Sequence, residues 1–320
     1  MKSVLAFFLV SIASFAQTLP VRIPPDEAAK HLSTSTRPKY PPLAEQARIQ
    51  GNVILEIEID PSGATSSMRL VSGHPMLVAA AMEAVRQWKY QPFDVAGHPG
   101  SVKTFVMVTF GNPSNHVAQD RAELVFQNDF WTLFESADGA VAKSDFRLAD
   151  EKMAKAGETV SADSKGNRHI YERWRWMTAM GRLRMFEHKN DEAEQYYKDA
   201  LATRENNKQE DGDTFEIGAS LANLAAFYRQ EKKLDLAHNH ADRALAIFNK
   251  SFKSVGQSNP SLRQVYGRAV VQESLLLLEI AKDQNDSAQV NKQCGTLTQF
   301  QAFLTAEGQS TFHSQCQPSK

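Results

Sequence analysis

The chain has 320 residues, of which 42% are hydrophobic, and its formal charge at pH 7 is −1. That length predicts about two domains, each with a substantial apolar core. The near-neutral charge excludes bulk electrostatic attraction to nucleic acid or to an anionic membrane surface.

The first residues, MKSVLAFFLVSIASFAQ, have the layout of a secretory signal peptide. Lys2 provides the positive start, an apolar run covers residues 4–13, and the small residues Ser14 and Ala16 precede a cleavage site. The run is shorter than the roughly 20 residues that span a bilayer. We predict a signal peptide over residues 1–16, cleaved after Ala16, and an exported mature protein without an integral membrane segment. The alternative is an uncleaved anchor.

A short linker over residues 17–37 leads to two strands. Residues 51–59, GNVILEIEI, place apolar side chains on one face and Glu56 and Glu58 on the other, which is the period of a half-buried strand. The sequence Asp-Pro-Ser-Gly that follows is a turn signal, and a second strand is predicted over residues 65–71. The two strands predict an antiparallel hairpin.

A helix and a third strand complete this region. Apolar residues from Leu77 to Trp88 recur at helical spacing, which predicts an amphipathic helix that lies on the sheet and ends before Pro92. Trp88 and Tyr90 are interpreted as core residues that fill the space at the far end of this helix. Residues 102–110 are β-branched and aromatic and predict the last strand.

Many spaced positions between residues 38 and 112 occur together in a fixed order: Tyr40-Pro41, Gly51, Val53, Asp60, Gly63, Ser72-Gly73, Leu77, the alanine pair of the helix, Trp88-Lys89-Tyr90 and Pro92. On these residues, the region resembles the TonB C-terminal domain family. The resemblance implies a small β-β-α-β fold and a periplasmic module that captures a short peptide of an outer-membrane transporter as an added strand. It also implies that the last strand is the edge strand, whose free main-chain groups would bind the partner.

The candidate partner-binding residues at this edge are Val102, Thr104, Val106, Val108 and Phe110. One departure concerns the energy-transducing role of the family. A transducer that resembles this domain also has a membrane anchor and a long Pro-rich spacer, whereas the linker here is about twenty residues long.

From about residue 118 onward, the pattern becomes helical. Connecting helices are predicted within residues 113–164, with a break at SADGAV, residues 136–141. Further on, residues 189–201 and 233–245 repeat one another at a spacing of 44, and each is preceded by another predicted helix. A weaker third pair follows over residues 261–283 and 286–304, and the last residues, 306–320, form a tail.

Repeats of this period predict a helical array, and the pattern over residues 165–305 resembles tetratricopeptide repeats. Such arrays form a concave surface that holds peptides. The candidate groove residues are Met177, Arg184, Asn223 and Arg229. The alternative is a plain scaffold whose concave face binds nothing or faces the first domain.

The two cysteines, Cys294 and Cys316, are predicted to form a disulfide, because export permits one; two free thiols are the alternative. No further Cys or close His pair completes a metal site, and no HExxH, GxSxG or P-loop motif occurs. We therefore expect neither a cofactor nor a metal, and no enzymatic activity.

Together, these observations predict an α+β protein: a small β-β-α-β domain followed by an all-α array. We interpret it as a periplasmic adaptor that binds an extended peptide at a sheet edge and a second protein partner of the cell envelope in the helical groove, with an outer-membrane transporter as one candidate and no nucleic acid. Two alternatives stay open: an anchored energy-transducer relative engaged in outer-membrane transport, and a hydrolase with an inter-domain site.

Overall fold

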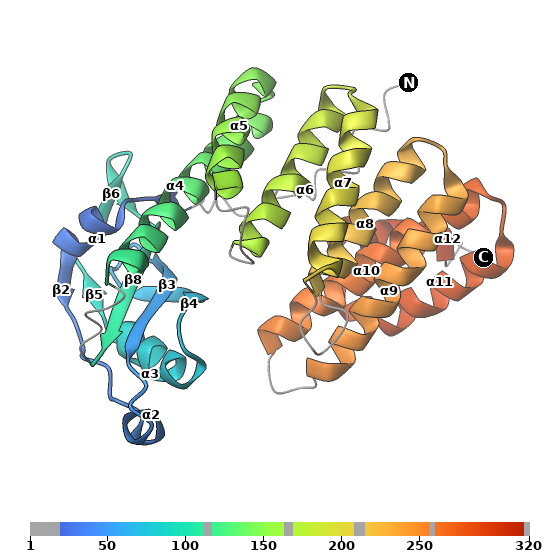
Figure 1. Cartoon of the computed structure of the whole chain (residues 1–320). Coiled ribbons are helices and arrows are strands. Elements are labelled where there is room, and N and C mark those ends of the chain that lie inside the picture. Colours follow the sequence, from blue (N-terminus) through green and yellow to red (C-terminus); the bar gives the residue numbers. More distant parts are fainter. Residues whose placement is uncertain (1–19, 112–116, 163–168, 208–214, 256–259, 317–320) are drawn as a thin grey trace. The chain divides into compact units, whose positions relative to one another are not determined.

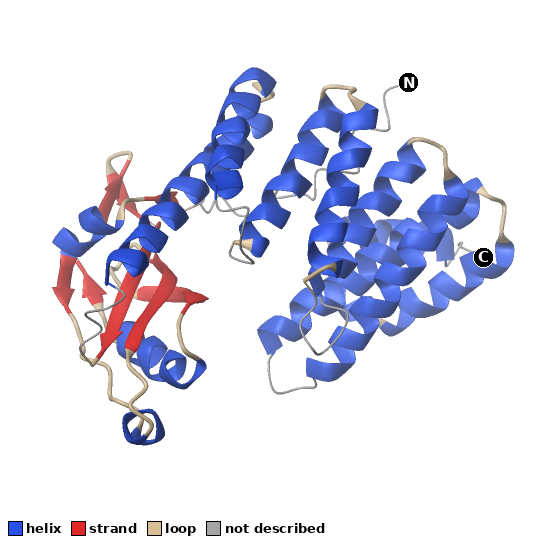
Figure 2. Ribbon diagram, viewed as in Figure 1, coloured by secondary structure: helices blue, strands red, loops and turns tan. Residues whose placement is uncertain are grey.

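The computed structural model describes residues 20–111, 117–162, 169–207, 215–255 and 260–316. The chain divides into two compact units, Met1–Thr132 and Leu133–Lys320. Strands occur in the first unit and helices make up the described part of the second, so the predicted α+β class is confirmed (Figure 2). The predicted signal peptide lies outside the described residues.

The main sheet of the first unit has four strands in the order β1-β8-β3-β4 (Figure 1). The predicted long strands are confirmed as β3 (Gly51–Ile59), β4 (Thr65–Ser72) and β8 (Val102–Phe110). Both β4 and β8 are antiparallel to β3. The fourth strand, β1 (Val21–Arg22), was not predicted from the sequence and pairs in parallel with β8.

The turn between β3 and β4 is held by its own side chains. One carboxylate oxygen of Asp60 accepts hydrogen bonds from the backbone N–H of Ser62 at 2.8 Å and of Ala64 at 3.1 Å. Gly63 follows with φ at +82°, a conformation that favours glycine. These contacts are the reason that the Asp-Pro-Ser-Gly sequence reverses the chain here.

The helix α3 (Pro75–Arg86) packs on one face of the sheet, and its buried residues Leu77, Ala81 and Val85 share a core with β3 and β8. It ends earlier than predicted, since Gln87 already caps it. The next residues form a short strand, β5 (Lys89–Tyr90), which pairs with β2 (Leu32–Thr34). The chain therefore leaves α3 to pair with a segment almost 60 residues earlier in the sequence, and Pro92 does not determine where the helix ends.

Trp88 and Tyr90 are core residues, as predicted. Tyr90 is buried, and the indole N–H of Trp88 donates to the carbonyl oxygen of Thr36 at 3.0 Å. Trp88 thus ties the end of α3 to the segment that precedes the hairpin. The remaining elements of the unit are short: α1 (Pro25–His31), α2 (Pro42–Gln46), and the hairpin of β6 (Phe93–Val95) with β7 (His98–Gly100).

The helix α4 (Val117–Ala142) runs without interruption through the SADGAV sequence, so the predicted break there is wrong. Ala137 and Ala140 are buried, and Asp138 pairs with Arg182. This burial and pairing outweigh the cost of about 1 kcal/mol for Gly139 in a helix interior. The boundary between the two units falls within α4. The next helix is α5 (Phe146–Ala162).

The second unit continues as consecutive helical hairpins. Within each hairpin the two helices are in contact, as are successive hairpins. A Cβ atom added at Gly181 would lie 2.7 Å from the ring of Tyr197, so the small residue permits the close approach that its position in the repeat suggests. The hairpins are α6 (Ile170–Phe186) with α7 (Asn190–Glu205), α8 (Phe215–Gln230) with α9 (Leu234–Val255), and α10 (Pro260–Asp283) with α11 (Ser287–Gln299), followed by the 3-10 turn η1 (Gln301–Phe303) and α12 (Ala306–Cys316).

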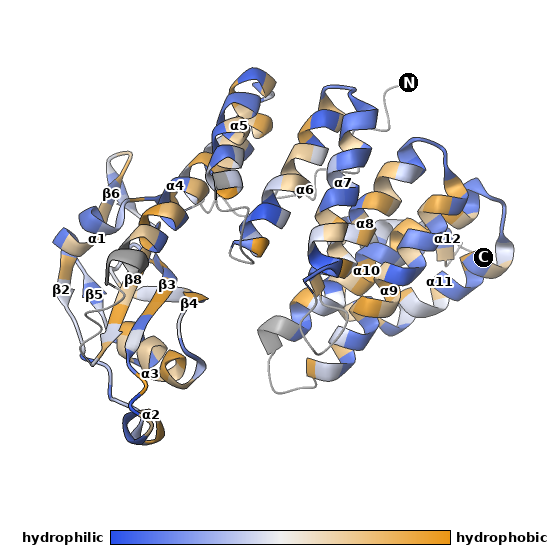
Figure 3. Cartoon of the chain, in the orientation of Figure 1, coloured by the Kyte–Doolittle hydropathy of each residue, from blue (hydrophilic) through white to orange (hydrophobic). Residues whose placement is uncertain are grey.

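Hydrophobic residues concentrate on β3 and β8 in the first unit and recur along the helices of the second (Figure 3). Within the described ranges, no helix combines the length and the apolarity that crossing a membrane would require.

Candidate strand-docking site

Strand β8 pairs with β3 along its whole length. The register runs from Gly51 opposite Phe110 to Ile59 opposite Val102 without a shift. Because this ladder is regular, main-chain groups of β8 alternate strictly between the flank that faces β3 and the opposite flank. We call the opposite flank of residues 101–109 the outer flank.

The first part of the outer flank is occupied by β1. The backbone N–H of Val21 donates to the carbonyl of Ser101 at 3.1 Å, and that of Ile23 donates to the carbonyl of Lys103 at 2.9 Å. The resemblance implied that β8 is the terminal strand of the sheet. This expectation is wrong, because β1 pairs with β8. Beyond Lys103, no strand within the described ranges pairs with the outer flank of β8.

The bonds of β1 also establish which residues of β8 face outward. Since the carbonyls of Ser101 and Lys103 point to β1, alternation directs the main-chain groups of Phe105, Met107 and Thr109 to the same flank. The five residues predicted from the sequence direct their main-chain groups to β3 instead. Their side chains lie on the α3 face of the sheet: Val102, Thr104, Val108 and Phe110 are buried and Val106 is half-buried.

The opposite edge of the sheet is strand β4, and its pairing is irregular. Strand β4 pairs with β3 through two register shifts, which leave Val71 and Ser66 as extra residues. Such bulges disrupt the regular spacing that a further strand would need, and they commonly protect edge strands. Of the two flanks, only that of β8 is regular.

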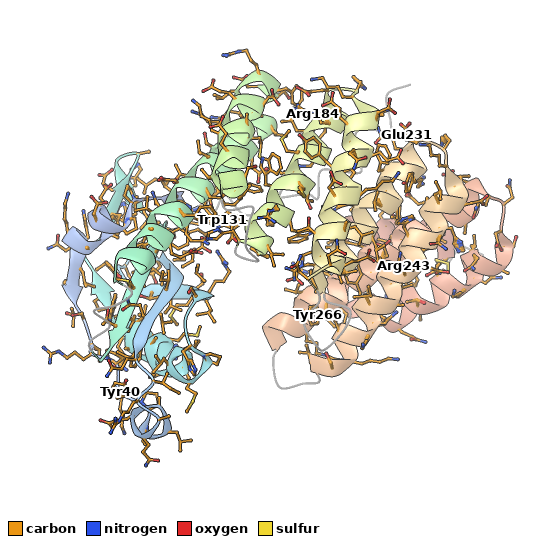
Figure 4. All side chains as sticks on the ribbon, viewed as in Figure 1. Tyr40, Trp131, Arg184, Glu231, Arg243 and Tyr266 are labelled. Carbon is orange, nitrogen blue, oxygen red and sulfur yellow. A yellow bond between two sulfur atoms is a disulfide. The ribbon has the colours of Figure 1, made fainter. Side chains whose placement is uncertain are left out.

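A partly buried ionic cluster connects β1 to the middle of the sheet. Arg22 reaches across β8 to one carboxylate oxygen of Glu56 at 2.5 Å, and Arg69 of β4 reaches the other at 2.9 Å. The side chain of Arg22 is only 3% exposed. Its guanidinium lies 4.8 Å from the ring centroid of Phe105, and that of Arg69 lies 5.5 Å from Trp131 of α4, which is labelled in Figure 4.

Opposing effects act on the carboxyl group of Glu56. Burial alone would raise its pKa, but the charge of Arg69 and the hydrogen bond from Arg22 outweigh burial, so the pKa lies below its ordinary value. Glu56 is therefore a fixed negative charge at neutral pH. The outer flank thus combines regular main-chain groups with a half-buried carboxylate that binds a basic side chain.

Sequence reasoning placed Glu56 on the solvent side of its strand and did not identify Arg22. The only local signal for β1 is the sequence Pro-Val-Arg-Ile-Pro, an aliphatic–basic–aliphatic tripeptide between prolines. Three residues carry too little periodicity to predict a strand.

Two of the four predicted groove residues are held in ion pairs inside the helical unit. Arg184, on α6 in Figure 4, pairs with Asp150, Glu187 and Glu192, and its side chain is 11% exposed. Arg229 pairs with Glu279 and Asp283. These pairs join neighbouring helices and explain both arginines without a ligand.

The other two are placed differently. The Met177 sulfur accepts a weak hydrogen bond from the Thr203 hydroxyl at 3.5 Å. Asn223 is half-buried on α8. The four side chains have separate environments, and among the contacts of the described residues none brings them together as one site.

The predicted disulfide between Cys294 and Cys316 is present and links α11 to α12. Within the described part of the chain, no group of three or more His, Cys, Asp or Glu side chains is arranged to hold a metal ion. Burial raises the pKa of the Glu273 carboxyl to about 8, and this residue is 3% exposed.

One segment of the chain matches a known family. Residues 36–111 match the model described as Gram-negative bacterial TonB protein C-terminal, so the predicted resemblance of this segment is confirmed. Protein TonB from Vibrio cholerae serotype O1 is 32% identical over 81 residues, which are 25% of this chain and 33% of that protein. Protein TonB from Xanthomonas campestris pv. campestris (strain B100) is 39% identical over 75 residues, 23% of this chain and 34% of that protein. The chain spans about a third of the length of these curated relatives.

Among solved structures, BtubC (BKLC) from P. vanneervenii aligns with a TM-score of 0.46 at 17% identity, over 55% of this chain and 65% of that chain. A likeness at this level carries no argument about function.

Proposed function

We propose that this protein mediates protein–protein interaction in the cell envelope, by adding an extended segment of a partner as a strand at the outer flank of β8. The observation that carries the proposal is the regular flank from Phe105 to Thr109, which no strand of the described chain pairs beyond Lys103. A segment of five or six residues would fit this length, which is typical of a strand. Main-chain hydrogen bonds would supply affinity.

The match of residues 36–111 to TonB C-terminal sequences supports the same proposal. In addition, we propose a second partner for the helical unit, whose consecutive hairpins resemble tetratricopeptide repeats. Because Arg184 and Arg229 are engaged in ion pairs, they are structural residues in this proposal, and Met177 and Asn223 remain the candidate contacts.

Photo-crosslinking in the bacterium that makes the protein tests the strand-addition proposal. A photoreactive side chain at Thr109 reports on the outer flank of β8, and one at Ser67 reports on the bulged edge as a control; both residues are exposed. We expect a discrete crosslinked partner from Thr109 and none from Ser67. Equal crosslinking from both positions would contradict the proposal, since it would show contact without a preferred edge.

A pair of proline substitutions adds a test of main-chain recognition. Met107→Pro removes an N–H that faces outward, whereas Val106→Pro removes one that faces β3. In the Thr109 photoprobe protein, Met107→Pro should abolish crosslinking while the thermal unfolding temperature stays close to that of the parent. Undiminished crosslinking in this variant would rule out strand addition.

We also propose that the mature protein is periplasmic and begins at Gln17. Mass spectrometry of the protein purified from the envelope fraction measures its first residue. A chain that starts at Met1 and sediments with the inner membrane would favour the alternative of an anchored transducer relative.

A further inference from the structure

The outer flank of β8 already holds a short strand of the same chain. Val21 and Ile23 donate their N–H groups to β8. The side chain of Arg22, which lies between them in the sequence, contacts Glu56 on β3. Val21 is 46% exposed, whereas Ile23 is buried in the core. The flank therefore recognises three features at once: a parallel backbone, a basic side chain and an aliphatic side chain after it.

Prolines limit how far β1 can extend. Pro20 precedes the strand and Pro24 follows it, and neither has an N–H to donate. The strand thus uses two outward carbonyls, those of Ser101 and Lys103, and the alternation of β8 leaves three further outward residues. Phe105 is only 1% exposed and α1 contacts β8. A longer strand without internal prolines would therefore have to displace α1 together with β1 to pair with all five, and it would then gain main-chain bonds that β1 cannot make.

The position of Glu56 makes this flank selective. Its charge is retained at neutral pH, and it lies on β3, next to β8, within reach of a side chain at the outer flank, as the contact with Arg22 demonstrates. A strand that took the place of β1 without a basic residue would leave Glu56 with Arg69 alone. Removal of one partner from a partly buried charge cluster is unfavourable.

We propose that β1 is an internal occupant of the docking flank, and that the partner segment that replaces it carries an aliphatic–basic–aliphatic pattern whose basic side chain binds Glu56. This inference rests on the proposed strand addition at β8 and goes beyond it, since it identifies the chemistry of the partner and the contact that must be displaced. In the absence of the partner, β1 shields the first outward carbonyls of the edge.

A binding experiment with a defined probe tests the proposal. The probe is a fluorescent synthetic peptide with the sequence of residues 18–26, TLPVRIPPD, and a second peptide carries Ala in place of its Arg. The proteins are the wild-type chain, Arg22→Ala, which weakens the internal strand, Arg22→Ala with Glu56→Gln, and Arg86→Ala. The last is a charge-matched control, because Arg86 forms an exposed ion pair with Glu83 on α3.

We expect Arg22→Ala to bind the basic peptide about tenfold more tightly than the wild type, because a larger share of molecules has an open flank. Arg86→Ala should bind like the wild type. On the Arg22→Ala protein, the Ala peptide should bind about tenfold more weakly than the basic peptide. With Glu56→Gln added, the two peptides should bind alike. Equal binding of the basic peptide to the wild type and to Arg22→Ala would overturn the proposal.

Hydrogen exchange on the wild-type chain gives a second readout that does not depend on the folding of any variant. When the basic peptide saturates the protein, the amides of Val21 and Ile23 should lose protection; retained protection would mean that β1 is not displaced.

Failure of the displacement inference can be distinguished from failure of the proposed strand addition. If crosslinking from Thr109 persists and remains sensitive to Met107→Pro while β1 stays protected, only the displacement inference is wrong. If the Thr109 photoprobe gives no crosslinked partner, strand addition itself is wrong.

Discussion

Gly63 and Tyr90 meet backbone to backbone. The N–H of Tyr90 donates to the carbonyl of Gly63 at 2.8 Å, and a Cβ atom added at Gly63 would lie 2.0 Å from the carbonyl oxygen of Tyr90. The tip of the β3–β4 hairpin is thus pressed against β5, so the glycine serves the contact between two segments as well as the turn.

Alanine substitution at Gly63 should cost stability in two ways: through backbone strain in the turn and through the clash with Tyr90. A comparison with Gly97 separates the two costs. Gly97 has a similar positive φ, +88°, but a Cβ there would meet nothing within 4 Å. Gly97→Ala should therefore cost only the backbone strain, about 1 kcal/mol. Gly63→Ala should cost roughly 1–3 kcal/mol more, because the backbone of Tyr90 must move. Urea unfolding of the two variants measures the difference, and equal losses would show that the contact is unimportant.

The two proline variants of β8 should differ in stability as well as in binding. Val106→Pro removes a hydrogen bond inside the ladder with β3 and leaves a carbonyl without its partner, which should lower the free energy of unfolding by roughly 1–3 kcal/mol. Met107→Pro should change it by much less, since its N–H lies on the outer flank. Circular dichroism during thermal unfolding measures both. A larger loss in Met107→Pro would mean that the assignment of outward residues is reversed.

Glu273 should make the stability of the helical unit depend on pH. Burial raises the pKa of its carboxyl to about 8, whereas the unfolded chain should titrate near the ordinary value of 4.5. Between these values the folded state holds a proton that the unfolded state has lost, so the free energy of unfolding decreases as the pH rises. We expect the protein to be less stable at pH 7.5 than at pH 5.

Glu273→Gln should remove most of this dependence and stabilise the unit at pH 7.5 by on the order of 3 kcal/mol. Urea unfolding at the two pH values measures the effect. Glu307→Gln, which changes an exposed carboxylate on α12, serves as the control. An unchanged pH dependence in Glu273→Gln would show that another group is responsible.

The disulfide between Cys294 and Cys316 should stabilise the C-terminal end of the helical unit. It closes a segment with a sequence separation of 22, and a loop of that size corresponds to about 3 kcal/mol in the chain-entropy model. Reduction should therefore increase hydrogen exchange in α12. A Cys294→Ala, Cys316→Ala variant should show the same exchange with and without reductant, which controls for other effects of the reagent.

Two helical glycines should respond to alanine in opposite directions. At Gly139 in α4 a Cβ would meet nothing within 4 Å, so Gly139→Ala should stabilise the protein by up to about 1 kcal/mol through helix propensity. At Gly181 the Cβ would meet the ring of Tyr197, so Gly181→Ala should be destabilising. Thermal unfolding of the two variants measures both signs, and stabilisation by Gly181→Ala would show that the hairpin of α6 and α7 is loosely packed.

The sequence predicted strands correctly where the pattern of side chains within the strand is sufficient. The alternation in residues 51–59 and the run of residues 102–110 gave the bounds of β3 and β8 as the structure has them. The prediction failed at SADGAV, where Gly and Asp are both unfavourable in a helix interior. There the burial of Ala137 and Ala140 and the pairing of Asp138 with Arg182 on α6 sustain α4, and no local pattern reports such contacts.

The sequence by itself determined the strands, the turn between β3 and β4, the succession of helices and the cysteines that form the disulfide, because each depends on residues close together in the chain or on their chemistry. Only the tertiary structure decided that β1 covers the start of the β8 edge and that Arg22 binds Glu56. These contacts join residues 34 to 81 positions apart, and a tripeptide between prolines has too little periodicity of its own to reveal the strand it pairs with. The candidate site therefore depends on a pairing between distant segments that becomes visible only when the chain is folded.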